Sequence, residues 1–409
     1  MGKDNSVLRN VTFVLAWLAF EHIHHIWSFT WPWLTLGNTF SIQPIFIQWY
    51  KFTGVLGGSF WVLISNLSFY EQIKKGKFKI TSALIVLVPM ALSITMYFGD
   101  DIVSKRTNCI RVGVMLTNFS SDEYVSDSIK LELVKEEILK KDPKNLKYML
   151  FPETFFKENI WADGFAFSKL YKELQSLSKA THTKIMSGYF LNREEEDGIY
   201  QQGNGLFKFN QYNSVIQIDT SISIPIKLKK VFIPIQEYTP SYLQVFDIQG
   251  YTNFKLLSGN KDYFKDEGQK IFMSICYESV NGIFFSDRWT DENLIFMIAS
   301  EAFLRGNSIA MQQYQNICRL RAIEFSKFLF KSSNAGIRSV SDERGEVVNF
   351  KRASKSVELL SYVGHTNNVK TFYSTWGWLT NKLPVFVLAI LILFIIFLPV
   401  IGSKSKFVD

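Results

Sequence analysis

The chain has 409 residues, of which 47% are apolar and only 20% are charged. This composition excludes a disordered chain, because it supplies enough apolar surface to offset the entropy of ordering. Three cysteines exclude a disulfide scaffold, and no spacing matches a zinc site. The net charge is +8, but the basic residues gather at the edges of apolar stretches. That distribution is typical of a membrane protein, and nucleic acid is not expected as a partner.

Four apolar stretches are long enough to cross a membrane as helices. The last contains no polar side chain, and the second and third carry no charge. The first is interrupted by Glu21 and three histidines. We predict that it also spans, with a buried core helix as the alternative. No small-residue cleavage site follows it, so it is not expected to be a signal peptide. The stretches are Asn10–Phe29, Phe52–Tyr70, Ile80–Phe98 and Leu383–Ile401.

The basic residues predict which way these spans run. Four lysines fill the short loop between the second and third stretches, and short basic loops stay in the cytoplasm. The basic residues near both chain ends then also lie inside, and Trp31 and Trp33 fall at the outer interface. The long segment before the last stretch must face outward. The loop lysines are Lys74, Lys75, Lys77 and Lys79, and the terminal basic residues are Lys3, Arg9, Lys404 and Lys406.

These patterns divide the chain into three expected parts. Residues 1–104 form a membrane region with about three transmembrane helices, and residues 105–375 form an extracytoplasmic domain. Residues 376–409 form a final transmembrane helix with a short basic cytoplasmic tail. The sequence therefore predicts a multi-pass protein that is integral to the membrane.

The outward-facing segment has alternating strand and helix patterns, which indicate a layered α/β domain with helices covering sheets. Turn signals within 203–219 predict hairpin-like strand pairs, and the acidic run Glu194–Asp197 is interpreted as a solvated turn. Strands are expected at Ile110–Leu116, Leu146–Phe151, Lys184–Leu191, Lys270–Ile275 and Leu294–Ile298. Helices are expected at Asp127–Lys141, Phe165–Ala180 and Ser308–Phe328.

Three short strings place reactive side chains at element ends, where layered α/β folds usually bind ligands. Alone, each has an ordinary explanation: a Cys is often a small buried hydrophobe, a Glu a turn residue and a Lys pair solvated. Together, an acid, an amine and a thiol supply what covalent acyl transfer needs, since a thiolate attacks a carbonyl and an ammonium stabilises the oxyanion. The strings are Phe151-Pro152-Glu153-Thr154, Lys229 to Tyr238, and Ser274-Ile275-Cys276-Tyr277-Glu278.

These strings resemble those of the carbon–nitrogen hydrolase (nitrilase) superfamily, and within it the membrane-bound apolipoprotein N-acyltransferases. The resemblance rests on Pro152-Glu153, on Lys229 eight residues before Glu237-Tyr238, and on Cys276-Tyr277-Glu278. It covers nearly the whole chain, because further similar strings lie in both the membrane part and the outer segment. These are Gln48-Trp49, Thr53–Gly57, Gln313, Arg319–Glu324, Ser333–Ile337 and Thr371–Tyr373.

The resemblance implies a nitrilase-like layered α-β-β-α sandwich flanked by transmembrane helices, and a Glu-Lys-Cys triad. Cys276 would attack a phospholipid ester to give a thioester. The acyl chain would then pass to the N-terminal amine of the diacylglyceryl-cysteine of an apolipoprotein. Glu153 would be the general base and acid, and Lys229 would stabilise the tetrahedral intermediate. Supporting or substrate-lining roles fall to Glu237, Tyr277, Glu278 and Glu301.

The implied enzyme resides in the cytoplasmic (inner) membrane, with its catalytic domain on the periplasmic face, and it needs no cofactor or metal. One alternative is a membrane-tethered amide or nitrile hydrolase with the same nucleophile and water as acceptor. Another is a non-enzymatic membrane protein that keeps the fold without activity.

The chain departs from the family pattern in two respects. It offers about four spans where the family usually has eight, which suggests either an N-terminal truncation or a reduced membrane part. The family's Asn-Asp-x-Trp-Phe string appears as Ser300-Glu301-Ala302-Phe303-Leu304, so an acid is kept and the indole is lost. This second change bears on the acceptor side of the site.

Several other residues have competing interpretations. His22, His24 and His25 do not all share one helix face, so a metal site is not expected. Cys109 and Cys318 are expected to be packing residues, with a mutual disulfide as the alternative outside the cytoplasm. Arg319 and Arg321 either hold Glu324 or another acid in place, or lie on a solvated helix face.

Overall fold

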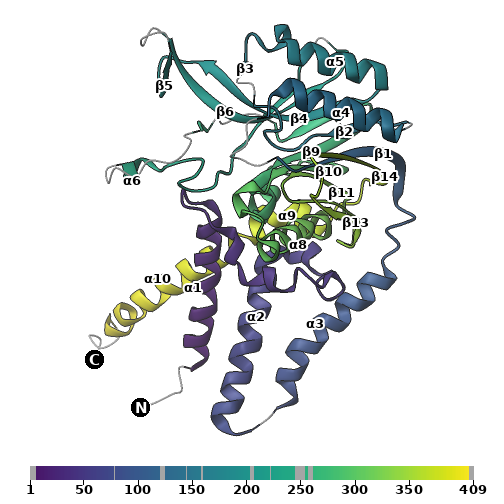
Figure 1. Cartoon of the computed structure of the whole chain (residues 1–409). Coiled ribbons are helices and arrows are strands. Elements are labelled where there is room, and N and C mark those ends of the chain that lie inside the picture. The colour runs from purple at the N-terminus through teal and green to yellow at the C-terminus, as the bar shows by residue number, and fades with distance from the viewer. Residues whose placement is uncertain are drawn as a thin grey trace. The chain divides into compact units, whose positions relative to one another are not determined.

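The computed structural model describes residues 6–77, 79–119, 125–143, 145–157, 160–202, 207–221, 223–244, 254–256 and 261–404. The chain divides into two compact units (Figure 1). The first contains Met1–Asp100, Gly282–Asp287 and Thr371–Asp409, and the second contains Asp101–Asn281 and Arg288–Lys370.

The first unit is helical. Three of its segments are long and apolar enough to cross a membrane: Tyr50–Lys75, Ile80–Gly99 and Phe372–Ile396. They coincide with the second, third and last predicted spans, which therefore form helices of the required length and composition. The 21-residue helix over the first stretch is not among them, so its spanning stays a prediction. The unit contains α1 (Ser6–Ile26), α2 (Tyr50–Lys75), α3 (Ile80–Gly99), α7 (Gly282–Arg288), α9 (Phe372–Thr380), α10 (Leu383–Lys404) and the 3₁₀ turns η1 (Pro32–Leu34), η2 (Leu36–Phe40) and η3 (Pro44–Phe46).

The second unit combines strands with a few helices. Its strands are β1 (Arg106–Thr117), β2 (Tyr148–Leu150), β3 (Ile160–Trp161), β4 (Lys184–Glu194), β5 (Tyr200–Gln202), β6 (Phe207–Ile218), β7 (Ile226–Leu228), β8 (Tyr263–Asp266), β9 (Gln269–Ile275), β10 (Leu294–Ser300), β11 (Leu329–Asn334), β12 (Ile337–Ser341), β13 (Val347–Arg352) and β14 (Val357–Asn367). Its helices are α4 (Asp127–Lys141), α5 (Lys169–Thr181), α6 (Ser241–Gln244) and α8 (Ser308–Phe325), with the 3₁₀ turns η4 (Phe165–Phe167), η5 (Cys276–Val280) and η6 (Ala302–Leu304).

The strands form a continuous path in the order β5-β6-β4-β2-β1-β11-β10-β9-β8. Neighbours from β4 to β9 along this path are parallel, and β14 runs antiparallel along β1. The two halves of the path meet face to face, because the Tyr148 ring on β2 lies 5.4 Å from the Phe296 ring on β10. The Tyr148 hydroxyl also donates to Asp266 on β8 at 2.6 Å.

Helices cover both outer faces of these strands. Figure 1 shows α4 and α5 on one side and α8 on the other. Buried residues of α4 and α5, such as Val134 and Leu174, join the apolar core with Met149 and Ile185 of the strands. This arrangement confirms the predicted layered α/β architecture, in which amphipathic helices bury one face on each sheet.

Most predicted elements are present, with three corrections. Helix α5 begins at Lys169 and not at Phe165, because Ser168 is extended and caps the helix, and Phe165–Phe167 form the separate turn η4. Helix α8 ends at Phe325 and not at Phe328, because Ser326 takes a left-handed conformation (φ +50°) that closes the helix. The acidic run is not a simple solvated turn, because Glu195 accepts from the Tyr212 hydroxyl at 2.8 Å and from Lys255 Nζ at 3.1 Å. The antiparallel pairing of β4, β5 and β6 confirms the hairpins, although residues 203–206 lie outside the described residues.

Candidate active site

Glu153 lies in the loop that leaves β2, and its side chain is buried. The loop passes unusually close to β4 at Gly188. A Cβ atom on Gly188 would lie 2.7 Å from the Thr154 nitrogen and 2.8 Å from the Glu153 Cα. Such distances are too short for any other residue, so Gly188 allows the acid-bearing loop to rest against the sheet.

Gly188→Ala is therefore expected to displace the Glu153 loop. The clashing atoms belong to the backbone and cannot rotate away, and a misplacement of about 1 Å typically costs about 10²-fold in rate. The rate of acyl-adduct formation on Cys276, measured by intact-protein mass spectrometry, should fall accordingly. Gly164→Ala is the matched control, because the nearest contact of its Cβ would be the Trp161 carbonyl oxygen at 3.9 Å. Equal rates for both variants would contradict this role of Gly188.

Lys229 follows β7, and its side chain is fully buried. Its Nζ donates to Glu153 Oε1 at 2.9 Å and to Glu237 Oε1 at 2.7 Å. Burial by itself would lower the pKa of Lys229, but the charges of Glu153, Glu237 and Cys276 raise it above its usual value. The ammonium therefore stays charged between two carboxylates, and it retains a third N–H for another acceptor.

Cys276 is the first residue after β9 and has a φ of +46°. This conformation costs a non-glycine residue about 1–3 kcal/mol and persists only where the surroundings hold it. The Tyr314 hydroxyl supplies part of that restraint, since it donates to the Cys276 carbonyl at 2.8 Å. Burial and the charge of Glu153 raise the pKa of the Cys276 thiol well above its usual value, and Lys229 opposes them. The resting thiol is thus protonated at neutral pH and needs a base.

The backbone of Ser300, at the end of β10, links the nucleophile to the acid. Its N–H donates to Glu153 Oε2 at 3.1 Å, and its carbonyl lies 3.9 Å from Cys276 Sγ. Lys229 contacts the other oxygen of the same Glu153 carboxylate. The structure therefore brings the predicted acid, amine and thiol together, although they are far apart in the sequence.

A buried amide that the sequence did not single out completes this cluster. Asn213 on β6 donates through Nδ2 to Glu153 Oε1 at 2.8 Å and to Glu237 Oε1 at 3.4 Å. The backbone carbonyl of Asn213 accepts from the backbone N–H of Lys229 at 2.8 Å. One feature of the sequence could have indicated this residue. Strand β6 contains several polar residues that do not alternate regularly with apolar ones, and its second half is buried.

The predicted supporting residues lie around this cluster. Glu237 accepts from the Ile233 N–H at 2.9 Å, and burial together with Glu153 raises its pKa against the opposing effect of Lys229. Tyr277 is almost fully buried beside the nucleophile, and burial raises the pKa of its phenol. Glu278 accepts from the Ile275 N–H at 2.8 Å, directly before Cys276.

Glu301 occupies a different place from the others. It is fully buried and forms an ion pair with Lys331 at 2.7 Å, and Ser333 Oγ donates to it at 2.8 Å. A Cβ on Gly336 would lie 2.3 Å from its carboxyl carbon, so a glycine is required there. Because Glu301 follows Ser300, this ion pair supports the strand end that contacts the acid and the thiol.

The pH dependence of Cys276 reactivity follows from its surroundings. Since burial and Glu153 raise the pKa of the thiol, its alkylation rate with iodoacetamide should keep rising above pH 9. A small free thiol should level off near its pKa of about 8.5. Lys229→Met should move the Cys276 profile to still higher pH, because the cation that lowers the thiol pKa is removed. If the alkylation rate of Cys276 reached its midpoint at a lower pH than that of the free thiol, the pKa of Cys276 would not be raised and this prediction would be wrong.

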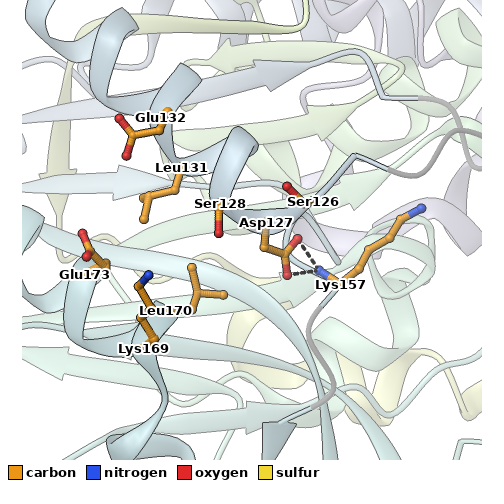
Figure 2. A pocket seen from close by; sticks show the side chains of 9 residues that line it. All are labelled: Ser126, Asp127, Ser128, Leu131, Glu132, Lys157, Lys169, Leu170 and Glu173. Carbon is orange, nitrogen blue, oxygen red and sulfur yellow. Dashed lines mark hydrogen bonds between the residues drawn. The ribbon is translucent and has the colours of Figure 1, made fainter.

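A surface pocket lies elsewhere in the second unit. It has a volume of about 390 Å³, and Figure 2 shows that the start of α4, the start of α5 and Lys157 line it. Asp127 in this pocket accepts from the Lys157 N–H at 2.9 Å. None of the predicted site residues lines this pocket.

The remaining predictions have mixed outcomes. The suggested disulfide is wrong, because Cys109 and Cys318 are both free and only Cys109 is exposed. Arg321 does hold Glu324, at 2.9 Å with both side chains fully buried, so the solvated-face alternative is wrong for it. Among the described residues, no group of three or more His, Cys, Asp or Glu side chains could hold a metal ion.

The second unit has the layered sandwich and the clustered Glu, Lys and Cys side chains expected of the carbon–nitrogen hydrolase class. A family model described as the apolipoprotein N-acyltransferase N-terminal domain matches residues 3–68. The apolipoprotein N-acyltransferase of Rickettsia prowazekii is 25% identical over 398 residues, which cover 92% of this chain and 74% of that protein. The Haemophilus influenzae protein of the same name is 24% identical over 94% of this chain and 73% of its own length.

This chain is therefore similar, along most of its length, to proteins named apolipoprotein N-acyltransferase. It is also similar to two solved structures, each with a TM-score of 0.44. A CN-hydrolase superfamily protein from Xanthomonas campestris is 12% identical and covers 62% of this chain and 91% of its own. A nitrilase superfamily member from Saccharomyces cerevisiae is 13% identical and covers 67% and 95%. Because the long sequence matches carry the acyltransferase name, the amide or nitrile hydrolase alternative is not favoured.

Proposed function

We propose that this protein is an N-acyltransferase that moves an acyl chain from a membrane phospholipid to the N-terminal amine of an apolipoprotein. The observation that carries the proposal is the position of Lys229. Its ammonium lies between Glu153 and Glu237, and Ser300 links Glu153 to Cys276. A base, a cation and a thiol in one buried cluster are what a thioester mechanism requires.

In the first half-reaction, Glu153 takes the thiol proton as Sγ attacks the ester carbonyl of the phospholipid. The third N–H of Lys229 stabilises the oxyanion. The tetrahedral intermediate collapses as the C–O bond breaks, and Glu153 returns the proton to the departing alkoxide. The products are a lysophospholipid and a thioester on Cys276.

In the second half-reaction, the free amine of the lipid-modified N-terminal cysteine attacks the thioester. Glu153 accepts a proton from the amine and returns it to the thiolate as the C–S bond breaks. The product is an amide, and the thiol is regenerated. Hydrogen bonds from Asn213 to Glu153 and from Lys229 to Glu237 hold the carboxylate and the ammonium in position.

The proposed location is the cytoplasmic membrane, with residues 105–375 on its periplasmic face. This orientation rests on the lysines between the second and third spans, since short basic loops remain in the cytoplasm. Both proposed substrates carry acyl chains and would be met at that membrane surface. Labelling of single cysteines introduced near Lys77 and within 105–375, with a membrane-impermeant thiol reagent in intact cells, tests this orientation.

The test of the reaction uses the full chain in detergent with phospholipid. Intact-protein mass spectrometry should show one acyl adduct, located at Cys276. A diacylglyceryl-cysteine peptide added next should become N-acylated while the adduct disappears. An adduct that yields only free fatty acid would show that water is the acceptor, and the absence of any adduct would overturn the proposal.

A further inference from the structure

A second lysine in the strand that precedes Lys229 is also completely buried. Lys227 lies two residues earlier on β7, on the same face, because side chains along a strand repeat every two residues. It forms an ion pair with Glu278, and both side chains have no exposed surface. No role in the proposed chemistry uses this lysine.

The Glu278 carboxylate touches the two segments that carry the amine and the thiol. Its Oε2 accepts from the Ile275 N–H at 2.8 Å, and its Oε1 accepts from the Lys230 N–H at 2.7 Å. Ile275 immediately precedes Cys276, and Lys230 immediately follows Lys229. One carboxylate therefore joins the nucleophile turn to the Lys229 segment through backbone hydrogen bonds.

Such an arrangement depends on a counter-charge. A carboxylate with no exposed surface is strongly disfavoured as an anion unless a cation pairs with it, and a protonated carboxyl would lose an acceptor position. Lys227 is the ion-pair partner, and Glu278 and Asp262 oppose the effect of burial, which lowers the pKa of this lysine. Asp262 extends the cluster, since it lies 4.0 Å from Lys227 Nζ and accepts from Lys230 Nζ at 2.7 Å.

We propose that Lys227 is a positioning residue that fixes the Glu278 carboxylate through their buried ion pair, so that Glu278 can hold the Cys276 turn and the Lys229 segment in place. This inference rests on the proposed function only for the identity of the substrate. Because Cys276 has a positive φ, its backbone conformation is unfavourable by itself and persists only where neighbouring contacts restrain it.

The test compares the full-length wild type with Lys227→Met, which keeps the length of the side chain and removes its charge. At saturating phospholipid, the rate of acyl-adduct formation on Cys276 should fall by about 10²-fold, as expected for a misplaced reacting group. The phospholipid concentration at half-maximal rate should not change. Lys327→Met is the matched control, because Lys327 is also buried but donates to Asn367 and Val369, away from the site.

A double-mutant cycle separates positioning from general damage to the fold. Glu278→Gln should reduce the rate as much as Lys227→Met, and the double variant should be no slower than either. Additive losses, or a loss in Lys327→Met equal to that in Lys227→Met at matched thermal stability, would overturn the proposal. An unchanged rate in Lys227→Met would also overturn it.

A second readout keeps this test independent of the substrate. Alkylation of Cys276 by iodoacetamide, followed by peptide mass spectrometry, needs no phospholipid. Its pH profile should shift in Lys227→Met and remain unchanged in Lys327→Met. If the wild type forms no acyl adduct, the proposed function fails, and the alkylation profiles still decide the role of Lys227.

Discussion

Cys276→Ala is expected to form no acyl adduct with phospholipid and to transfer no acyl chain to an acceptor peptide. The substitution removes the sulfur atom proposed to carry the thioester, and Glu153 cannot replace it, because its carboxylate is already hydrogen-bonded to Lys229, Asn213 and Ser300. Loss of a covalent nucleophile typically lowers the rate by several orders of magnitude. Intact-protein mass spectrometry after incubation with phospholipid checks the result.

The chain supplies its own matched control for this experiment. Cys318 is a second buried cysteine, and burial raises the pKa of its thiol to about 11. It lies in α8 and is not bonded to Glu153 or Lys229 through any described contact. Cys318→Ala should therefore keep the adduct and the activity. Persistence of the adduct in Cys276→Ala, or its disappearance in Cys318→Ala, would show that the nucleophile was assigned to the wrong residue.

Lys229→Met is expected to slow thioester formation by at least the factor of about 10² to 10³ that the loss of an oxyanion stabiliser costs. The variant also leaves Glu153 and Glu237 buried without the cation that they share, which should lower the free energy of unfolding by about 3–5 kcal/mol. Single-turnover acylation and chemical denaturation measure the two effects separately.

The double variant Lys229→Met with Glu237→Gln keeps this prediction testable if the single variant unfolds. Removing one carboxylate charge relieves the repulsion that the lost lysine leaves behind. The double variant should regain stability but not acylation rate. Near-wild-type acylation by either variant would exclude Lys229 as the stabiliser of the tetrahedral intermediate.

The sequence was sufficient to predict most helices and strands and to identify the three strings with reactive side chains. The apolar stretches predicted the long helices α1, α2, α3 and α10, and strand β9, which ends at Ile275 just before Cys276, follows from a short apolar run. Helix α8 was extended too far because a left-handed Ser326 leaves no composition signal. Local patterns thus predict elements well but not where an unusual backbone conformation ends them.

The partners of the reactive residues could not be predicted, because they come from distant parts of the chain. Asn213 and Glu153 are 60 residues apart, and Lys227 and Glu278 are 51 residues apart. Lysines are usually solvated, yet Lys227 and Lys229 are both buried, and each forms an ion pair with a carboxylate from a distant part of the chain. Only the three-dimensional structure shows which charged side chains are buried and which residues they pair with.

The link through Ser300 also bears on how this site can change over evolutionary time. Both contacts of Ser300 with Glu153 and Cys276 use backbone atoms, so they do not depend on the identity of the side chain. Substitutions at this position can accumulate without erasing the link, provided that the strand path is kept. The link between the acid and the thiol thus tolerates a change of the Ser300 side chain, whereas the neighbouring Glu301 is fixed by its buried ion pair with Lys331.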